Sequence, residues 1–98
     1  MGILLVPDQY VDDGVMIKQV SSNGPAQLVG LKGIQRDRAG NIIPGDIIVG
    51  IDGNRIRNSS DLLSQLDNYV PGDRIEIVFK RAERPLSVEL TLGSTTDR

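Results

Sequence analysis

Apolar and polar residues alternate over several short runs of this chain. An apolar run at residues 3–6 closes at the dipeptide PD, and residues 14–20 alternate loosely before the turn-forming sequence SSNG. Short alternating runs bounded by Pro, Gly, Asn or Ser are typical of β-strands. The pattern therefore predicts two strands in the first part of the chain.

A third strand is predicted at residues 46–51, where Ile47, Val49 and Ile51 alternate and are expected to share one face of a sheet. The dipeptide DG follows directly. It favours a tight turn, after which residues 55–56 run back briefly in the opposite direction to the strand.

Two strands near the end of the chain form a predicted hairpin. Residues 74–80 and 86–92 both alternate, and residues 81–85 carry the turn between them. The apolar positions expected on one side are Ile75, Ile77 and Phe79 in the first strand and Leu86, Val88, Leu90 and Leu92 in the second. The polar residues 94–98 are expected to be a frayed tail, so that the domain spans residues 1–93.

Two helices are predicted between the strands. Pro25 suits the first turn of a short helix, and Gly30 ends it. The clearer helix covers residues 59–69, because Asn58 is a good N-cap and Asp61 follows it as part of an approximate capping box. The sequence VPG ends this helix.

The predicted elements follow the order strand, strand, short helix, strand, longer helix, hairpin. Residues 31–44 mix charges, glycines and isoleucines without a period, which favours a long loop that can hold a small hairpin. This order predicts an α+β domain, in which two helices cap a small, mainly antiparallel, curled sheet or partial barrel.

Composition excludes several classes of function. The 98 residues, 39% hydrophobic and 24% charged, fit one globular domain. Acidic and basic residues are interspersed and the net charge is -2, which leaves no basic face for nucleic acid. No apolar run approaches the roughly 18 residues that a membrane span needs. We expect neither a nucleic-acid partner nor a membrane span.

The chain contains no His and no Cys. It therefore lacks the residues of a Ser-His-Asp or Cys-His nucleophile and of a thiolate zinc site, and we expect no catalytic residue, metal or cofactor. Asp46 and Asp52 flank a predicted strand and are expected to serve turns. Gly45 and Gly50 have the spacing of a phosphate-binding loop but lack the Lys-Ser/Thr that follows it.

Four stretches together carry a family resemblance: GVMIKQVSSNGPAQLVGLK, IIPGDIIVGIDGNRI, SSDLLSQL and GDRIEIVFKR. Nearly the whole chain resembles the PDZ domain of HtrA/Deg-type serine proteases. The charged loop at residues 35–43 and the opening G-I-x-x-x-P-D-Q are most similar to the chloroplast and cyanobacterial Deg branch. The resemblance implies the circularly permuted strand order of that family, with the peptide-binding strand first and the closing strand last.

A PDZ domain binds an extended peptide, usually a C-terminus, as an added strand between a sheet edge and a helix. The resemblance implies that Met1, Gly2, Ile3 and Leu4 form the carboxylate-binding loop, where glycine lets successive N–H groups converge on an anion. The basic residue that often precedes this loop in the family is not in the chain. From the pattern alone, residues 1–5 fit an ordinary edge strand without a ligand equally well.

The resemblance implies that the longer helix forms the opposite wall of a peptide groove. The residues expected along this groove are Leu5, Ser59, Leu63 and Leu66. Leu62 and Val70 are expected to lie toward the core, although leucines at helical spacing are also the normal pattern of a simple core. Ser59 stands where many metazoan PDZ domains carry a His that recognises a ligand hydroxyl, so we expect a preference for apolar ligand residues there.

The resemblance implies a noncatalytic module of a serine protease, which captures C-termini or exposed apolar segments of substrates and regulates the protease. Its expected partners are C-terminal or unfolded peptide segments and the parent protease domain. The alternative is an assembly module whose groove pairs with a neighbouring domain or subunit. An independent small enzyme is disfavoured. The family's usual locations are the bacterial periplasm or cell envelope and the thylakoid.

Overall fold

The computed structural model of the chain describes residues 3–11, 13–22 and 24–92. Met1 and Gly2 of the expected carboxylate-binding loop, and the predicted tail at residues 94–98, lie outside the described residues. The elements are β1 (Ile3–Leu5), the 3-10 helix η1 (Asp8–Tyr10), β2 (Val15–Val20), α1 (Pro25–Leu28), β3 (Gln35–Arg36), β4 (Ile42–Ile43), β5 (Ile47–Ile51), β6 (Asn54–Arg55), α2 (Ser59–Leu66), β7 (Arg74–Arg81) and β8 (Arg84–Thr91).

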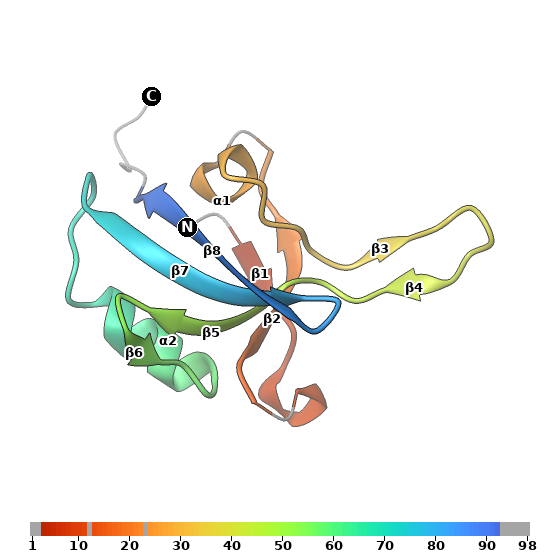
Figure 1. Ribbon diagram of the computed structural model, residues 1–98, viewed down its shortest axis with the longest axis horizontal. Coiled ribbons are helices and arrows are strands. Elements are labelled where there is room, and N and C mark those ends of the chain that lie inside the picture. Colours follow the sequence, from red (N-terminus) through yellow and green to blue (C-terminus); the bar gives the residue numbers. More distant parts are fainter. Residues whose placement is uncertain (1–2, 12, 23, 93–98) are drawn as a thin grey trace.

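The body of the molecule is an antiparallel sheet with the strand order β1-β2-β5-β7-β8, in which β6 also pairs with β5. The sheet is curled but open, and α1 and α2 lie at different ends of it (Figure 1). Strands β3 and β4 pair with each other and project from the body as a two-stranded arm. The predicted α+β fold is confirmed. The first and last of the described strands, β1 and β8, lie at the two edges of the sheet.

Apolar side chains from the strands and both helices meet in one core. Its buried members are Val15, Ile17, Ala26, Leu31, Ile48, Ile51, Ile56, Leu62, Ile75, Ile77, Phe79 and Leu90. The inward face predicted for the strand at residues 74–80 is therefore confirmed. Burial of such side chains, at about 25 cal/mol per Å² of apolar area, is the main term that holds a domain of this size together.

The predicted face of β5 is wrong. Ile48 is fully buried, whereas Ile47 and Val49 are only half-buried. The pairing with β7 shifts register between Ile48 and Gly50, so that Val49 is the extra residue of a bulge. A bulge changes the phase of the alternation, and for this reason both Ile48 and Ile51 reach the core.

The predicted end of the longer helix is also wrong. α2 ends at Leu66, and the backbone N–H of Tyr69 donates to the Leu66 carbonyl in a tighter turn. Val70, predicted to lie toward the core, is 63% exposed. Its N–H donates to the Asp73 carboxylate at 2.9 Å, which fixes Val70 in a surface turn after the helix.

The turn between β7 and β8 is shorter than predicted. Arg81 pairs with Arg84, so that only Ala82 and Glu83 form the turn. Both residues have positive φ values, of 52° and 65°. Two consecutive positive φ values match the right-handed twist of a hairpin. Because neither residue is Gly or Asn, the sequence does not reveal this turn type.

Candidate functional site

β1 is an edge strand of the sheet. Its residues Ile3, Leu4 and Leu5 are opposite Val20, Gln19 and Ile17 of β2. In the described part of the chain, β2 is the one strand that borders β1. An edge strand has a row of backbone N–H and C=O groups that a further strand can pair with.

The side chains of β1 alternate between the core and the solvent. Ile3 and Leu5 are half-buried and pack against the core, whereas Leu4 is 57% exposed. Because the apolar side chains at Ile3 and Leu5 anchor the strand, its backbone is held in place while its outer edge stays open. This is the arrangement that strand addition requires.

α2 begins as the sequence predicts. The Asn58 side chain accepts a hydrogen bond from the Asp61 backbone N–H at 2.9 Å, and the Asp61 carboxylate accepts one from the Arg57 N–H at 3.0 Å. These two bonds satisfy N–H groups at the helix start that have no partner within the helix. The predicted N-cap is confirmed. The Asp61 carboxylate accepts the N–H of Arg57, one residue before the Asn58 N–H that a capping box uses.

The leucines of α2 divide between core and surface. Leu62 is fully buried, as predicted, and Leu66 is half-buried and packs against the same core as Ile3 and Leu5. Leu63 is 60% exposed. Leu5 and Leu66 thus pack on the same core, and Leu63 is an exposed apolar side chain on the same helix as Leu66.

Ser59 is bound by a residue that sequence reasoning missed. Its backbone N–H donates to Asp8 Oδ1 at 3.0 Å, and its hydroxyl donates to Asp8 Oδ2 at 2.8 Å. Asp8 begins the short helix η1, which follows β1 after Val6 and Pro7. The dipeptide PD indicates a turn, but nothing local in the sequence shows that the carboxylate reaches the start of α2.

Asp46 is buried, and its carboxylate is fully occupied. It accepts the Lys32 backbone N–H at 2.8 Å and the Arg81 Nε and Nη2 groups at 2.9 and 2.8 Å. The hydrogen bonds to Asp46 raise the pKa of Arg81. Arg81 also donates to the Gly30 carbonyl at 2.8 Å. The Asp46–Arg81 pair therefore joins three parts of the backbone. Both carboxylate oxygens of Asp46 accept hydrogen bonds, so neither is free for acid–base chemistry.

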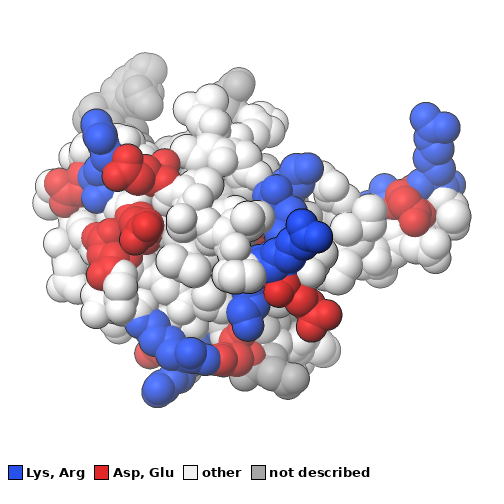
Figure 2. Space-filling view, in the orientation of Figure 1, with Lys and Arg blue, Asp and Glu red and all other residues white. Residues whose placement is uncertain are grey.

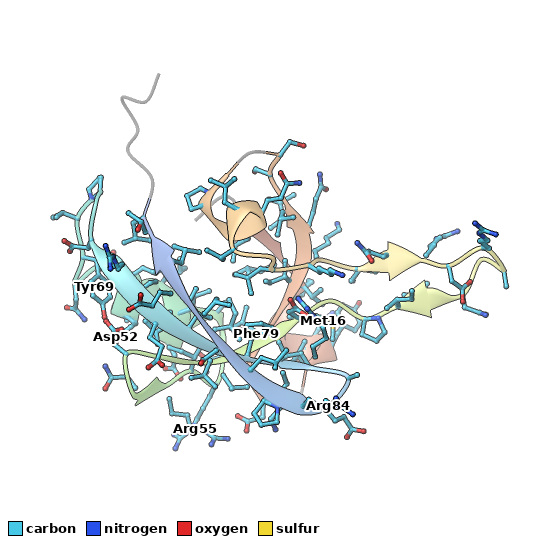
Figure 3. The ribbon with its side chains drawn as sticks, turned by 45° about the horizontal axis from the view of Figure 1, so that its top comes forward. Met16, Asp52, Arg55, Tyr69, Phe79 and Arg84 are labelled. Atoms are coloured by element: carbon cyan, nitrogen blue, oxygen red, sulfur yellow. The ribbon has the colours of Figure 1, made fainter. Side chains whose placement is uncertain are left out.

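Asp52 has a similar structural role on the surface. Its carboxylate accepts the Glu76 backbone N–H at 2.8 Å and the Tyr69 hydroxyl at 2.5 Å. The Glu76 N–H first, and then Tyr69, lower the pKa of Asp52. Figure 3 shows Asp52 and Tyr69 beside each other. Among residues 3–11, 13–22 and 24–92, no three Asp, Glu, His or Cys side chains gather as a metal site.

Two cavities lie outside the expected groove. One, of about 430 Å³, lies between β6 and α2 and is lined by polar residues that include Arg57, Asp61 and Gln65. The other, of about 640 Å³, lies beside the β7–β8 turn. Neither of these two cavities is lined by a residue of β1, so neither lies against the expected peptide-binding strand.

Comparison with known proteins agrees with this geometry. The family model described as PDZ domain matches residues 1–92. The chain belongs to the PDZ domain family. PDZ domains are protein-interaction modules, and the match accounts for all of the described elements.

Two chloroplast proteases of Arabidopsis thaliana are similar to this PDZ domain. Protease Do-like 1 is 33% identical over 101 residues, covering 99% of the chain and 23% of the protease, and Protease Do-like 8 is 34% identical over 97 residues, covering 94% and 22%. The putative serine protease HhoB of Synechocystis is 31% identical over 82 residues, or 84% of the chain and 17% of HhoB. The resemblance to the PDZ domains of Deg/HtrA-type proteases is confirmed, and the chain spans less than a quarter of these relatives.

Solved structures share the fold. The PDZ domain of an SdrC-like protein from Listeria monocytogenes superimposes with a TM-score of 0.66 at 24% identity, covering 84% of the chain and 74% of that domain. An aminopeptidase N family protein from Idiomarina loihiensis gives a TM-score of 0.72 at 24% identity, covering 94% of the chain and 13% of that protein. Within the described residues, the helices are too short or too polar to cross a membrane.

Proposed function

We propose that this domain binds extended peptides with free C-termini by strand addition along the outer edge of β1. The observation that carries the proposal is the open edge of β1, whose side chains Ile3 and Leu5 are anchored on the core. In this arrangement the backbone of the peptide pairs with β1. Met1, Gly2, Ile3 and Leu4 are the proposed carboxylate-binding loop.

The proposed groove favours apolar ligands. Leu5 and Leu66 pack on the core and Leu63 is exposed, so an aliphatic side chain of the ligand can be buried beside them. Because the Ser59 hydroxyl already donates to Asp8, its hydrogen is not available to a ligand. Asp8 also brings a negative charge to that end of the groove. We therefore propose that acidic ligand residues are disfavoured near Ser59.

The expected affinity is modest. A strand hydrogen bond contributes a net ~0.5–1.5 kcal/mol to binding. A buried aliphatic side chain contributes about 1.5–3 kcal/mol. Ordering of the peptide and loss of its free motion oppose binding by several kcal/mol. The balance gives a Kd of roughly micromolar or weaker. Such an affinity suits transient capture of many different substrates.

The relatives suggest the setting of this activity. They are named as proteases, two of them chloroplastic, and the chain matches less than a quarter of each. We propose that this domain collects C-termini or exposed apolar segments of substrates for a serine protease domain and relays their binding to it. A chloroplast or cell-envelope location fits these relatives.

The proposal is tested by titrating the domain with peptides that end in Val or Leu, each with a free and an amidated C-terminus. A charge-assisted hydrogen bond is worth more than a neutral one, so the free terminus should bind roughly tenfold tighter. Equal binding of both forms, together with self-association that rises with protein concentration, would instead favour an assembly module.

Variants locate the site. Leu63→Asp should abolish binding without unfolding the domain, because Leu63 is 60% exposed and a charge there opposes an apolar ligand. Leu66→Asp should also abolish binding, with circular dichroism to check its fold. Leu28→Asp is the matched control, since Leu28 is a 76% exposed leucine of α1. If Leu63→Asp binds like the unchanged domain, this assignment of the groove is wrong.

A further inference from the structure

The β3–β4 arm carries exposed isoleucines beside a cation. Arg36 pairs with Ile42 across the arm, so their side chains lie on one face of it. Gln35 pairs with Ile43 on the other face, and Ile43 also lines the cavity of about 640 Å³ at the base of the arm. Ile42 is 63% exposed, and Ile34, which precedes β3, is 37% exposed. The face with Arg36 and Ile42 therefore presents a positive and an apolar group together.

The arm has a surplus of positive charge. Residues 31–45 contain the cations Lys32, Arg36 and Arg38 and a single acid, Asp37, so their net charge is +2. The whole chain has a net charge of -2, so the remaining residues carry -4. Within the described residues, none of the three cations of the arm forms an ion pair.

The arm is held in place at its tip and at its base. At the tip, the Asp37 carboxylate accepts the backbone N–H groups of Ala39 and Asn41, both at 2.9 Å. At the base, a Cβ added to Gly33 or Gly45 would lie 2.5 or 2.0 Å from a backbone carbonyl oxygen of β2. Both legs of the arm thus cross β2 with no space for a side chain. A preformed arm loses little conformational entropy when it docks.

The end of the β7–β8 sheet away from its turn carries an acidic face, made of Asp52, Glu76 and Glu89. Glu76 lies directly opposite Glu89, both are exposed, and Asp52 accepts the Glu76 backbone N–H. Like charges in opposite positions destabilise a sheet. Arg74 lies 3.9 Å from Glu89, but these side chains are 72% and 70% exposed, so the pair compensates little. Lys80 is four residues further along β7, about 13 Å away.

The positive arm and the acidic face lie at opposite ends of the molecule. Figure 2 shows the arm at one end of the longest axis and a group of Asp and Glu side chains at the other. The molecule extends 40 Å along this axis, so the arm cannot reach the acidic face of its own domain. The interspersed charges expected from the sequence are thus separated in the fold. Neither surface includes a residue of β1 or α2.

We propose that the β3–β4 arm of one molecule docks on the acidic face of a second copy of this chain, with Arg36 and Arg38 beside Glu76 and Glu89. A second copy is the occupant because the two complementary surfaces belong to one chain. The two cations offset the repulsion between the opposed glutamates. Each copy uses its arm on one neighbour and its acidic face on another, so the contact is heterologous and builds rings or chains.

The contact combines charge with a small apolar area. Val78 is half-buried and lies two residues after Glu76 on the same face of β7. Ile42 shares a face with Arg36, so it packs on Val78 when Arg36 lies beside Glu76. Exposed ion pairs are individually weak. We therefore expect a Kd of roughly 0.1–1 mM between single domains at low salt.

Charge-swapped variants test this contact. The arm variant Arg36→Glu, Arg38→Glu and the face variant Glu76→Lys, Glu89→Lys should each remain monomeric in diffusion NMR at about 1 mM protein, where the unchanged domain self-associates. Mixed in equal amounts, the two variants should associate at least as tightly as the unchanged domain, because each negative arm then meets a positive face. Raising the salt to about 0.5 M should weaken the association by about fivefold or more.

Matched controls keep the size of the charge change and move it elsewhere. Arg84→Glu and Glu83→Lys change exposed residues at the β7–β8 turn, outside both surfaces, and should self-associate like the unchanged domain. Circular dichroism checks the fold of every variant. Leu63→Asp, and a peptide that ends in Val, should leave the self-association unchanged. These last two results separate this contact from the proposed peptide groove and from assembly through it.

Several results would overturn the proposal. A monomeric unchanged domain at about 1 mM would mean that this contact does not form. Self-association of the face variant would assign the arm to another surface, and a mixture of the two variants that stays monomeric would show that the swapped charges do not meet. Loss of association in Leu63→Asp would assign the contact to the β1 groove. Binding to phosphatidylglycerol vesicles that is lost in the arm variant, without self-association, would assign the arm to a lipid surface.

Discussion

Asp8 and Ser59 are separated by 51 positions in the sequence and are joined by two hydrogen bonds, one to the Ser59 backbone N–H and one to its hydroxyl. Asp8 follows β1 and Ser59 begins α2. The bonds therefore connect α2, one proposed wall of the peptide groove, to η1, the short helix that follows the other proposed wall, β1. A carboxylate at the start of a helix also interacts favourably with the N-terminal end of the helix dipole.

Replacing Asp8 by Ala should lower the free energy of unfolding by about 1–2 kcal/mol, since it leaves the Ser59 N–H without its acceptor. Asp8→Asn should lose less, because the amide oxygen still accepts a hydrogen bond. Urea denaturation measures both values. Asp67→Ala is the control: Asp67 is an exposed acid at the other end of α2, so its removal should cost nothing or stabilise slightly.

A double-mutant cycle isolates the hydroxyl bond. Ser59→Ala keeps the backbone bond to Asp8, so the coupling between Asp8→Ala and Ser59→Ala should be about 0.5–1.5 kcal/mol. Additive effects of the two substitutions would show that the hydroxyl bond contributes nothing to stability.

Much of the fold was predictable because local patterns suffice for it. The alternation at residues 74–80 gives the buried face of β7, and Asn58 gives the start of α2. The β5 bulge was not predictable, because the register shift at Val49 exists only in relation to β7. The family pattern predicts Val70 toward the core, whereas its bond to Asp73 places it in a surface turn.

The sequence likewise predicts only part of the candidate site. The family resemblance predicts β1 at a sheet edge, and in the described part of the chain β1 borders β2 alone. The partner of Ser59 lies far away in sequence, so no local pattern indicates Asp8. No local pattern indicates the cavity at the base of the arm either, since its lining comes from η1, β2, β4, β5 and the β7–β8 hairpin.

Arg81→Ala should destabilise the domain by roughly 2–4 kcal/mol, because it leaves the buried Asp46 carboxylate with the Lys32 N–H alone. Arg81→Lys should recover only part of this loss, since an ammonium cannot make the two-pronged contact of the guanidinium. Arg74→Ala is the matched control at the exposed end of the same strand and should change stability by less than about 0.5 kcal/mol. Equal losses for Arg81→Ala and Arg74→Ala would refute the structural role of the buried pair.

The bond between Asp52 and Tyr69 predicts a dependence of stability on pH. The pKa of Asp52 is lowered from its ordinary value of 3.8, so its contribution is present above that value and is lost as the pH falls through the folded-state pKa. The pKa of Tyr69 is raised from 10.0, mainly by Asp52, so its contribution is present below 10.0 and is lost as the pH rises through the folded-state pKa.

Tyr69→Phe should therefore reduce stability most near neutral pH, and the difference from the unchanged domain should shrink below pH 3.8 and above pH 10.0. Urea denaturation at a series of pH values measures this difference. Tyr10→Phe is the control, because Tyr10 is 70% exposed and its hydroxyl has no hydrogen-bond partner among the described residues. A pH-independent effect of Tyr69→Phe would argue that the loss comes from packing alone.

Glu83→Gly should stabilise the domain by about 0.5–1 kcal/mol, since Glu83 has a φ of 65° that glycine adopts without strain. Glu89→Gly is the contrasting substitution. It places glycine within β8, where the added backbone freedom of the unfolded chain should cost about 0.5–1 kcal/mol. Thermal unfolding distinguishes the two variants. A lower Tm for Glu83→Gly would show that the positive φ of Glu83 does not destabilise the folded domain.

Gly45 and Gly50 come from one stretch of sequence but should differ sharply in their tolerance of a methyl group. A Cβ at Gly45 would lie 2.0 Å from the Ile17 carbonyl oxygen, a backbone atom that cannot move without breaking the strand pairing around it. A Cβ at Gly50 would meet its nearest atom, the Asn54 carbonyl oxygen, at 3.5 Å, which is an ordinary contact. Gly45→Ala should therefore cost at least about 3 kcal/mol, and Gly50→Ala less than about 1 kcal/mol, in urea denaturation. If Gly45→Ala does not fold, circular dichroism shows the loss of structure directly. Equal stability of Gly45→Ala and Gly50→Ala would contradict the close approach of Gly45 to β2.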